Sequence, residues 1–259
     1  RQVCFEKLAQ RRGGIIPYHH ETSYDPNASL GGQMDKYWDL SGDEPELVKE
    51  SYRFYGQQSL NEEFATIFHK MQETEIPFVS YRTNRTEDGG VACRCRRFTS
   101  ERLEFVPAYE ILESRKKRQD VNYYQTYIDI VAEHGIDREE IQNFMDYQTM
   151  TDFLISNTDE HLMNFGMLRD SDTMELTAPA PIFDSGNSMF YSEKRTKPYT
   201  RQEILERKIT SFYSTEEKMM KNVTNPSVVD LEKVPSPDMV KAFYAKAGIP
   251  EDKVEFICA

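Results

Sequence analysis

The stretch NTDEHLMN, residues 157–164, is the most informative part of this sequence, and IFDSG follows it at residues 182–186. Together they supply an aspartate (Asp159), an amide (Asn164) and a second aspartate (Asp184), in that order. Transfer of a γ-phosphoryl group needs a carboxylate that orients the attacking hydroxyl, and oxygen ligands for the Mg²⁺ that bridges the phosphates. The spacing of the first two residues is common by chance, whereas the ordered trio predicts phosphoryl-transfer chemistry.

The sequence around the trio, DFLISNTDEHLMNFGML followed by APIFDSGNSMF, resembles the catalytic core of HipA-like Ser/Thr kinases. These are distant relatives of protein kinases and phosphatidylinositol kinases. The resemblance implies that Asp159 is the catalytic residue and that Asn164 and Asp184 bind Mg²⁺ and the nucleotide. His161 is expected to hold the loop through hydrogen bonds. Glu160 departs from many members, which have an arginine or a small residue there, and this departure could alter substrate contacts.

The resemblance extends upstream to SLGGQMDK, residues 29–36, which is similar to the family's Ser-x-x-Gly-x-x-x-Lys loop over the nucleotide. Gly31 and Gly32 lack a Cβ atom, so their backbone can approach phosphates closely and present N–H groups to them. A Gly-Gly pair taken alone is more often a turn. The resemblance implies that Ser29 lies at the nucleotide and is an autophosphorylation site.

A lysine and a glutamate complete the expected nucleotide site. Residues 46–49 read as a short strand that ends in Lys49, and the resemblance implies that this lysine contacts the α- and β-phosphates. A helix is predicted near residues 61–72 from the helical spacing of its apolar residues. Its Glu62 could bridge to Lys49, as the corresponding glutamate of protein kinases does, and Glu63 is the alternative.

The predicted fold class is α+β, a bilobal protein-kinase-like fold with a small β-rich N-lobe and a larger, mainly helical C-lobe. The N-lobe would comprise residues 1–98 and the C-lobe residues 99–259. Residues 1–26 read as loop, and strands are expected over residues 34–50 around a turn at 41–45, over 77–81, and over 91–98 after a turn at 86–90. The boundary between the lobes is expected near 96–102, where the adenine would meet backbone groups of the hinge, assigned to Cys95–Phe98.

The C-lobe is predicted to be built from helices that position the 157–164 loop. A helix over residues 122–133 is expected to end at Gly135, a good C-terminal cap. Asp137 and Glu140 are expected to open the next helix as a capping-box variant, and that helix runs directly into the loop. Further helices are predicted over residues 201–221 and 237–247.

Composition narrows the function classes. The 259 residues carry a net charge of −12, with a pI near 5.0, which argues against broad direct binding of nucleic acids or anionic membranes. Two basic clusters, at residues 94–97 and 115–118, are expected to be solvated faces, or contacts to an acidic partner surface, tRNA or DNA. No run of 18 apolar residues exists, so no transmembrane span is expected.

Cysteine usage and the chain ends bear on location. Cys93 and Cys95 have the wrong spacing for a zinc site and are expected to be unpaired thiols on one face of a strand. Reduced cysteines and the lack of an export signal predict a cytoplasmic protein. The sequence begins without a methionine and ends abruptly, so we expect it to be a truncated part of a longer chain. The adjacent pair His19 and His20 is read as surface or pocket-rim residues.

The expected function is an ATP- and Mg²⁺-dependent Ser/Thr protein kinase of HipA type that acts on a protein hydroxyl and autophosphorylates. Its partners would be a protein substrate carrying Ser or Thr and an antitoxin-like or DNA-binding protein. One alternative is a regulatory binding protein of the toxin–antitoxin type with little turnover, and another is a lipid or small-molecule kinase. Retention of the trio together with Lys49 favours the active protein kinase.

Overall fold

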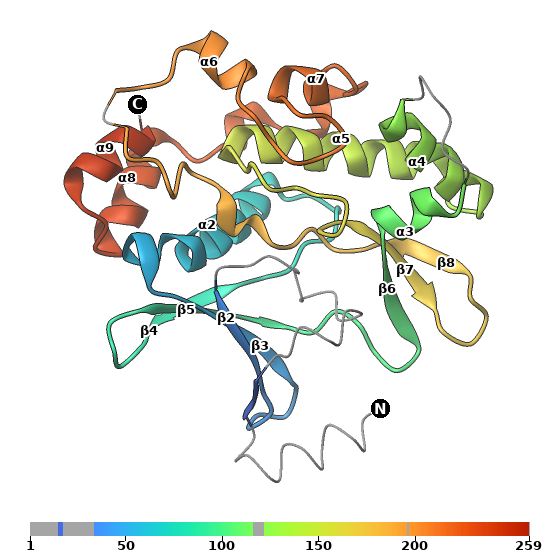
Figure 1. Cartoon of the computed structure of the whole chain (residues 1–259), viewed down its shortest axis with the longest axis horizontal. Helices are drawn as coiled ribbons and strands as arrows, with labels where there is room; N and C mark the ends of the chain where they lie inside the picture. Colours follow the sequence, from blue (N-terminus) through green and yellow to red (C-terminus); the bar gives the residue numbers. More distant parts are fainter. Residues whose placement is uncertain (1–14, 18–33, 116–121, 196, 259) are drawn as a thin grey trace.

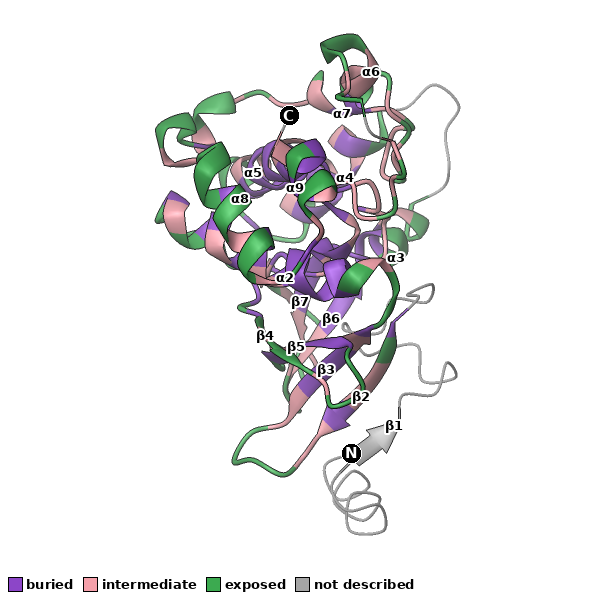
Figure 2. Cartoon of the chain, turned by 90° about the vertical axis from the view of Figure 1, so that its left-hand side faces the viewer, coloured by how far each residue is buried: buried purple, intermediate pink, exposed green. Residues whose placement is uncertain are grey.

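The computed structural model describes residues 15–17, 34–115, 122–195 and 197–258 (Figure 1). The candidate loop residues Ser29, Gly31 and Gly32 lie outside this described part, as does the pair at residues 19–20. In the described part, a sheet region occupies one end of the molecule and a helical region the other (Figures 1 and 2). None of the described helices is long and apolar enough to cross a membrane.

The first sheet is antiparallel and has the strand order β1-β2-β3-β5-β4. Its strands are β1 (Ile15–Pro17), β2 (Asp35–Asp39), β3 (Glu46–Ser51), β4 (Arg82–Arg85) and β5 (Val91–Arg96). The strands expected within 34–50 and 91–98 are therefore present, and β1 interrupts the segment that was read as loop. Lys49 lies near the end of the central strand β3, directly between Lys36 of β2 and Cys93 of β5.

Helix α2 (Gln57–Gln72) packs against this sheet and begins four residues earlier than expected. Its Leu60, Phe64 and Phe68 repeat every four residues and are buried. Gly56 precedes the helix with a φ of 76°, and a Cβ there would lie 2.3 Å from Cγ2 of Val91. Only glycine tolerates both the left-handed conformation and this close approach, so the entry into α2 is fixed by one residue.

A second, three-stranded antiparallel sheet has the order β6-β7-β8 and was not predicted. It consists of β6 (Leu103–Pro107), β7 (Gly166–Asp170) and β8 (Leu176–Pro179). Phe105 of β6 and Leu168 of β7 pack in one core cluster with Leu47 of the first sheet. The second sheet thus flanks the segment that contains Asp184 and ties it to the strand that carries Lys49.

The helical region contains α3 (Ala108–Glu113), α4 (Tyr123–Glu133), α5 (Arg138–Ile155), α6 (Arg201–Leu205), α7 (Glu216–Met220), α8 (Pro237–Lys246) and α9 (Glu251–Cys258). Helices α4, α5 and α8 match the expected ranges. The Asp137 carboxylate caps α5 by accepting bonds from the backbone N–H groups of Glu139 and Glu140. Figure 2 shows buried residues gathered where α2 lies between the sheet and the helical region.

Two predicted elements were wrong. Residues 77–81 form no strand, and Phe78 makes only an isolated bridge to Ile182. The helix expected over 201–221 is divided into α6 and α7, because Phe212 between them leaves the helical path to pack on Phe165, with ring centroids 5.3 Å apart. Tertiary packing has overridden the local helical pattern there. Helix α9 was not anticipated.

The cysteine prediction is confirmed for the described residues. Cys93 and Cys95 are free thiols, and both are buried on the same face of β5. The basic cluster at 94–97 is partly neutralised within the chain. Nη1 of Arg94 lies 2.7 Å from Oδ2 of Asp39, and Nη1 of Arg96 lies 3.2 Å from Oε2 of Glu44.

Candidate active site

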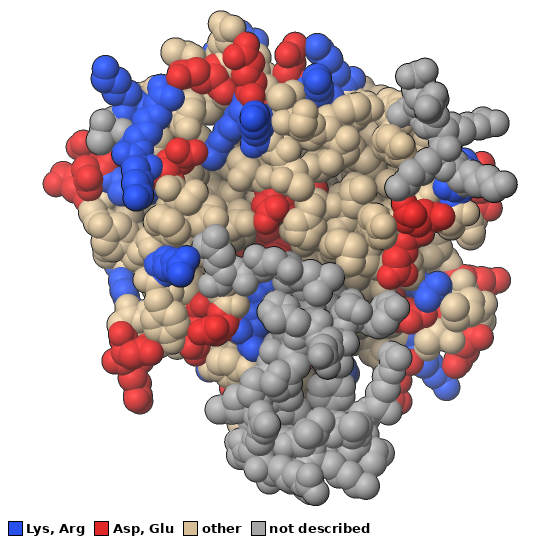
Figure 3. Space-filling view, in the orientation of Figure 1, with Lys and Arg blue, Asp and Glu red and all other residues tan. Residues whose placement is uncertain are grey.

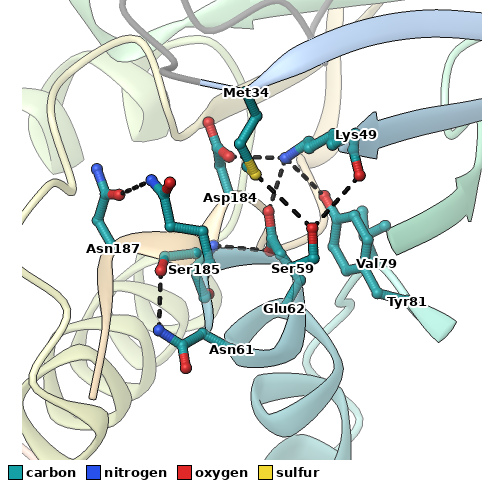
Figure 4. A network of polar contacts seen from close by, with 12 residues as sticks. Met34, Lys49, Ser59, Asn61, Glu62, Val79, Tyr81, Asp184, Ser185 and Asn187 are labelled. Atoms are coloured by element: carbon teal, nitrogen blue, oxygen red, sulfur yellow. Dashed lines mark hydrogen bonds and ion pairs between the residues drawn. The ribbon is translucent and has the colours of Figure 1, made fainter. Parts of the chain in front are cut away.

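A buried lysine joins three separate parts of the chain (Figure 4). Nζ of Lys49 on β3 lies 2.7 Å from Oε1 of Glu62 on α2 and 2.6 Å from Oδ1 of Asp184. It also lies 3.4 Å from the hydroxyl of Tyr81. The expected contact between Lys49 and Glu62 is therefore present. The alternative, Glu63, instead accepts a hydrogen bond from the Thr83 hydroxyl.

The charges in this cluster depend on one another. Burial alone would lower the pKa of Lys49, but the carboxylates of Asp184 and Glu62 raise it well above its ordinary value. Lys49 is therefore a cation at neutral pH. Burial raises the pKa of Glu62 to about 7, and Lys49 opposes that shift. Removal of either partner would leave the other buried and uncompensated, which is costly.

Asp184 adopts an unusual backbone conformation. Its φ of 64° and ψ of 45° place it in the left-handed region, immediately before the 3₁₀ turn η2 (Ser185–Asn187). Non-glycine residues in this region are strained and are typical of functional sites. The turn aims the Asp184 carboxylate at Lys49. It also lets the backbone N–H of Ser185 donate to Oε2 of Glu62 at 3.0 Å.

Polar side chains of α2 hold the segment that follows Asp184 (Figure 4). Nε2 of Gln57 donates to the Met189 carbonyl at 2.8 Å. Nδ2 of Asn61 donates to the carbonyls of Gly186 and Ser188, at 2.9 and 2.7 Å. The hydroxyl of Tyr244 on α8 in turn donates to Oδ1 of Asn61 at 2.8 Å. Helix α2 is thus fixed to the Asp184 segment on one side and to the C-terminal helices on the other.

Asp159 lies in the loop that follows α5. Its Oδ2 accepts a hydrogen bond from Nδ2 of Asn187 at 2.7 Å, while Oδ1 of Asn187 accepts one from Nε2 of Gln58 at 2.8 Å. Burial raises the pKa of Asp159, whereas His161 and Asn187 act to lower it. A chain of hydrogen bonds therefore runs from α2 through Asn187 to the candidate catalytic carboxylate.

Only the amide nitrogen of the Asn164 side chain forms a hydrogen bond with another described residue, and this bond orients the side chain. Its Nδ2 donates to the Asp159 carbonyl at 2.8 Å. Its Oδ1 is buried and has no hydrogen-bond partner among the described residues. A buried oxygen without a partner is unfavourable unless a ligand completes it.

A metal ion would fit this arrangement. The described residues contain no cluster of three or more His, Cys, Asp or Glu side chains that could hold a metal. Mg²⁺ does not require one, because it is usually bound by one or two protein ligands together with waters and substrate phosphates. The free oxygen of Asn164 and the carboxylate of Asp184 match that requirement.

Two further residues of the loop, His161 and Glu160, form hydrogen bonds within the protein. The backbone N–H of Met163 donates to Nδ1 of His161 at 3.3 Å, as expected of a histidine that holds the loop. Glu160 is buried, accepts a hydrogen bond from Gln148, and has its pKa raised well above the ordinary value by burial. The side chain of Glu160 therefore points into the core, and its effect on substrate contacts stays a prediction.

Sequence reasoning assigned no site role to Lys36 or to Asn187. Lys36 on β2 is the cross-strand partner of Lys49 on β3, so it lies beside the Lys49 cluster. Burial lowers the pKa of Lys36, and the nearby charge of Asp184 opposes this shift. Its position at the end of the SLGGQMDK motif was the available signal. Asn187 had none, since its contact to Asp159 joins residues 28 positions apart.

Replacement of Asn187 tests its effect on Asp159. The N–H donor of Asn187 favours the ionised carboxylate, so Asn187→Ala should raise the pKa of Asp159 further. For the kinase activity expected from the sequence, the acid limb of the pH–kcat profile should move to higher pH and kcat should fall about tenfold, with KM for ATP unchanged. The comparison variant Gln58→Ala, which keeps the bond to Asp159, should give a smaller shift. An unmoved acid limb in Asn187→Ala would contradict this role.

Comparison with known proteins identifies related chains. Residues 28–246 match the HipA-like C-terminal domain family. The serine/threonine-protein kinase CtkA of Helicobacter pylori (strain J99) is 29% identical over 104 residues, which are 39% of this chain and 32% of CtkA. The chain thus matches about a third of the length of this curated relative.

A solved structure is also similar. The crystal structure of the H. pylori proinflammatory kinase CtkA superimposes with a TM-score of 0.52 and 22% sequence identity, covering 66% of this chain and 60% of that one. This similarity confirms the predicted fold class, α+β and kinase-like.

Proposed function

Because the chain belongs to the HipA-like C-terminal domain family, we propose that it is an ATP- and Mg²⁺-dependent Ser/Thr protein kinase. The observation that carries this proposal is the buried Lys49 held between Glu62 and Asp184, which come from two distant segments. A cation so placed can bind phosphates while its own position is fixed by the two carboxylates. The CtkA relative supports the same activity.

Each residue has a distinct role in the proposed reaction. Asp159 orients the attacking hydroxyl of the substrate and accepts its proton. Lys49 contacts the α- and β-phosphates of ATP. Asn164 and Asp184 hold Mg²⁺, which when bound offsets charge on the phosphate oxygens. The fixed attachment of α2 to the 185–189 segment keeps these groups aligned before substrate arrives.

The loop at residues 29–36 is proposed to be regulatory. A phosphate on Ser29 would add a charge of roughly −1.5 to −2. That charge would be repelled by the ATP phosphates and would compete for the backbone N–H groups at Gly31 and Gly32. Autophosphorylation of Ser29 and ATP binding would therefore exclude one another, and the modified protein would be inactive.

Intact-mass spectrometry over a time course with ATP and Mg²⁺ tests both proposals. We expect the wild type to gain one phosphate that maps to Ser29, and Ser29→Ala to remain active without gaining it. Labelled ATP offered with protein and with lipid vesicles separates the activities. Label on protein serine or threonine supports the proposal, label on lipid indicates a lipid kinase, and no label in any arm indicates a binding protein. A phosphate elsewhere with Ser29 unmodified would reject self-inactivation alone.

A further inference from the structure

A basic segment follows the Asp184 turn. Residues 194–208 contain six Lys or Arg residues and two Glu residues, a net charge of +4 in a chain of net charge −12. Figure 3 shows Lys and Arg side chains gathered at the upper left of the molecule, where Figure 1 places the segment entering α6 and the end of α9. This basic segment is therefore a local reversal of the protein's overall charge.

Stacked aromatic rings and guanidinium groups hold the basic segment in place. The rings of Phe190 and Tyr199 are stacked, with centroids 5.4 Å apart and an interplanar angle of 18°. The guanidinium of Arg195 lies 4.2 Å from the Tyr199 ring centroid, and that of Arg207 lies 4.6 Å from the Phe190 ring centroid. Nζ of Lys253 on α9 donates to the Glu193 carbonyl at 2.9 Å. The segment is thus held as a layered stack against the helical region.

Its cations divide into two groups. Two are neutralised within the chain, because Arg195 pairs with Glu203 at 2.8 Å and Arg207 pairs with Glu193 at 3.4 Å. Four others are exposed and form no ion pair with any described residue: Lys194, Lys197, Arg201 and Lys208. These four cations, here called the free cations, are not required to hold the segment together.

The basic segment lies beside the catalytic loop. Nη1 of Arg207 donates to the Ser156 carbonyl at 3.3 Å. The backbone N–H of Thr210 donates to the carbonyl of Thr158, the residue before Asp159, at 2.9 Å. The C-terminal end of the basic segment, next to Lys208, therefore borders the loop that carries Asp159.

We propose that the free cations form a docking surface for an acidic segment of the protein substrate, close to its phosphoacceptor residue. This inference rests on the proposed function and specifies its substrate class. Complementary charge steers association and selects among partners, which is how a rim of exposed cations acts. The rest of this acidic protein repels acidic segments. Binding of an acidic segment would therefore depend on the free cations.

A protein segment suits this surface better than a nucleic acid does. Nucleic-acid sites combine many phosphate contacts with aromatic rings on which bases stack. Here the Phe190 and Tyr199 rings are already covered by each other and by two guanidinium groups. The net charge of −12 also opposes a long polyanion. A short acidic peptide requires only the few charges that the surface offers.

Fluorescence anisotropy with labelled peptides tests the inference. The probes are a serine followed by four aspartates and the same peptide with four lysines, measured at low and at physiological salt. We expect the acidic peptide to bind and the basic one not to, with binding weakened by salt. Lys197→Glu with Arg201→Glu should weaken binding of the acidic peptide about tenfold. The control pair, Lys70→Glu with Arg102→Glu, changes the net charge equally on other exposed elements and should leave affinity unchanged.

Two outcomes overturn the inference. One is acidic-peptide binding that is absent, or that is equal in wild type and in Lys197→Glu/Arg201→Glu. The other is a single-stranded oligonucleotide that binds the wild type and loses its affinity in Lys197→Glu/Arg201→Glu, while peptide binding does not change. That result would identify a nucleic-acid surface. ATP-driven mass gain, measured on the same proteins, separates the two proposals. A normal mass gain with unselective peptide binding rejects docking alone, and selective binding without a mass gain rejects the kinase activity alone.

Discussion

Asp159→Ala is expected to lower kcat by about 10²–10⁴-fold while leaving ATP affinity nearly unchanged. Asp159 is bonded to Asn187 and, through its carbonyl, to Asn164, and its carboxylate is not among the groups that contact Lys49. The substitution therefore removes the group that orients the hydroxyl and spares the cation that binds phosphates. Single-turnover kinetics and calorimetric ATP binding measure the two effects separately.

A matched control for Asp159→Ala is Asp172→Ala, in the exposed turn between β7 and β8. It removes one exposed carboxylate outside the candidate site and should leave both measurements unchanged. If Asp159→Ala kept near wild-type turnover with Mg²⁺ present, Asp159 would not be the catalytic residue. If both variants lost activity together, the cause would be a loss of folding, which thermal unfolding would reveal.

Asp184→Asn is expected to abolish the Mg²⁺-dependent part of ATP binding and to lower kcat/KM by about 10²–10³-fold. Of the two candidate metal ligands, Asp184 is the carboxylate and Asn164 is a neutral amide, so the change leaves the metal without a charged ligand from this pair. It also removes one of the two anions that hold Lys49, although Glu62 remains 2.7 Å away. Lys49 should thus stay charged and the fold should persist.

Calorimetry of ATP binding with and without Mg²⁺ measures the second effect. The wild type should bind ATP more tightly when the metal is added, whereas Asp184→Asn should show little difference between the two conditions. Equal affinities for wild type and variant under both conditions would rule out a metal role for Asp184. Thermal unfolding provides the folding control, because a melted variant would lose ATP binding regardless of the metal.

The parts of this site that depend on local sequence could be predicted. Lys49 and Glu62 stand at the end of a predicted strand and on a predicted helix, and the resemblance to HipA-like kinases implied their contact, which the structure contains. The three residues Asp159, Asn164 and Asp184 could be selected because they stand in the motifs NTDEHLMN and IFDSG. Position in a motif did not predict orientation, however: nothing in the sequence indicated that the side chain of Glu160 lies in the core.

The parts that depend on distant contacts could not be predicted. The β6-β7-β8 sheet joins strands of four or five residues, too short for a clear alternating pattern, and β6 and β7 are about 60 residues apart. Gln57 and Asn61 read as ordinary polar positions of a helix, yet they bind carbonyls more than 120 residues away. Phe212 shows the same limit, since its packing on Phe165 divides a segment that looked helical.

The Tyr244 hydroxyl has a consequence for how the molecule opens. It connects α8 to Asn61, and Asn61 connects α2 to the backbone of the 185–189 segment. Local unfolding of the C-terminal helices would therefore release α2 and, with it, the carboxylate that holds Lys49. Amide hydrogen exchange in α8 and α2 should then occur as one cooperative unit. An outward swing of α2 would therefore carry the energetic cost of unfolding that whole unit.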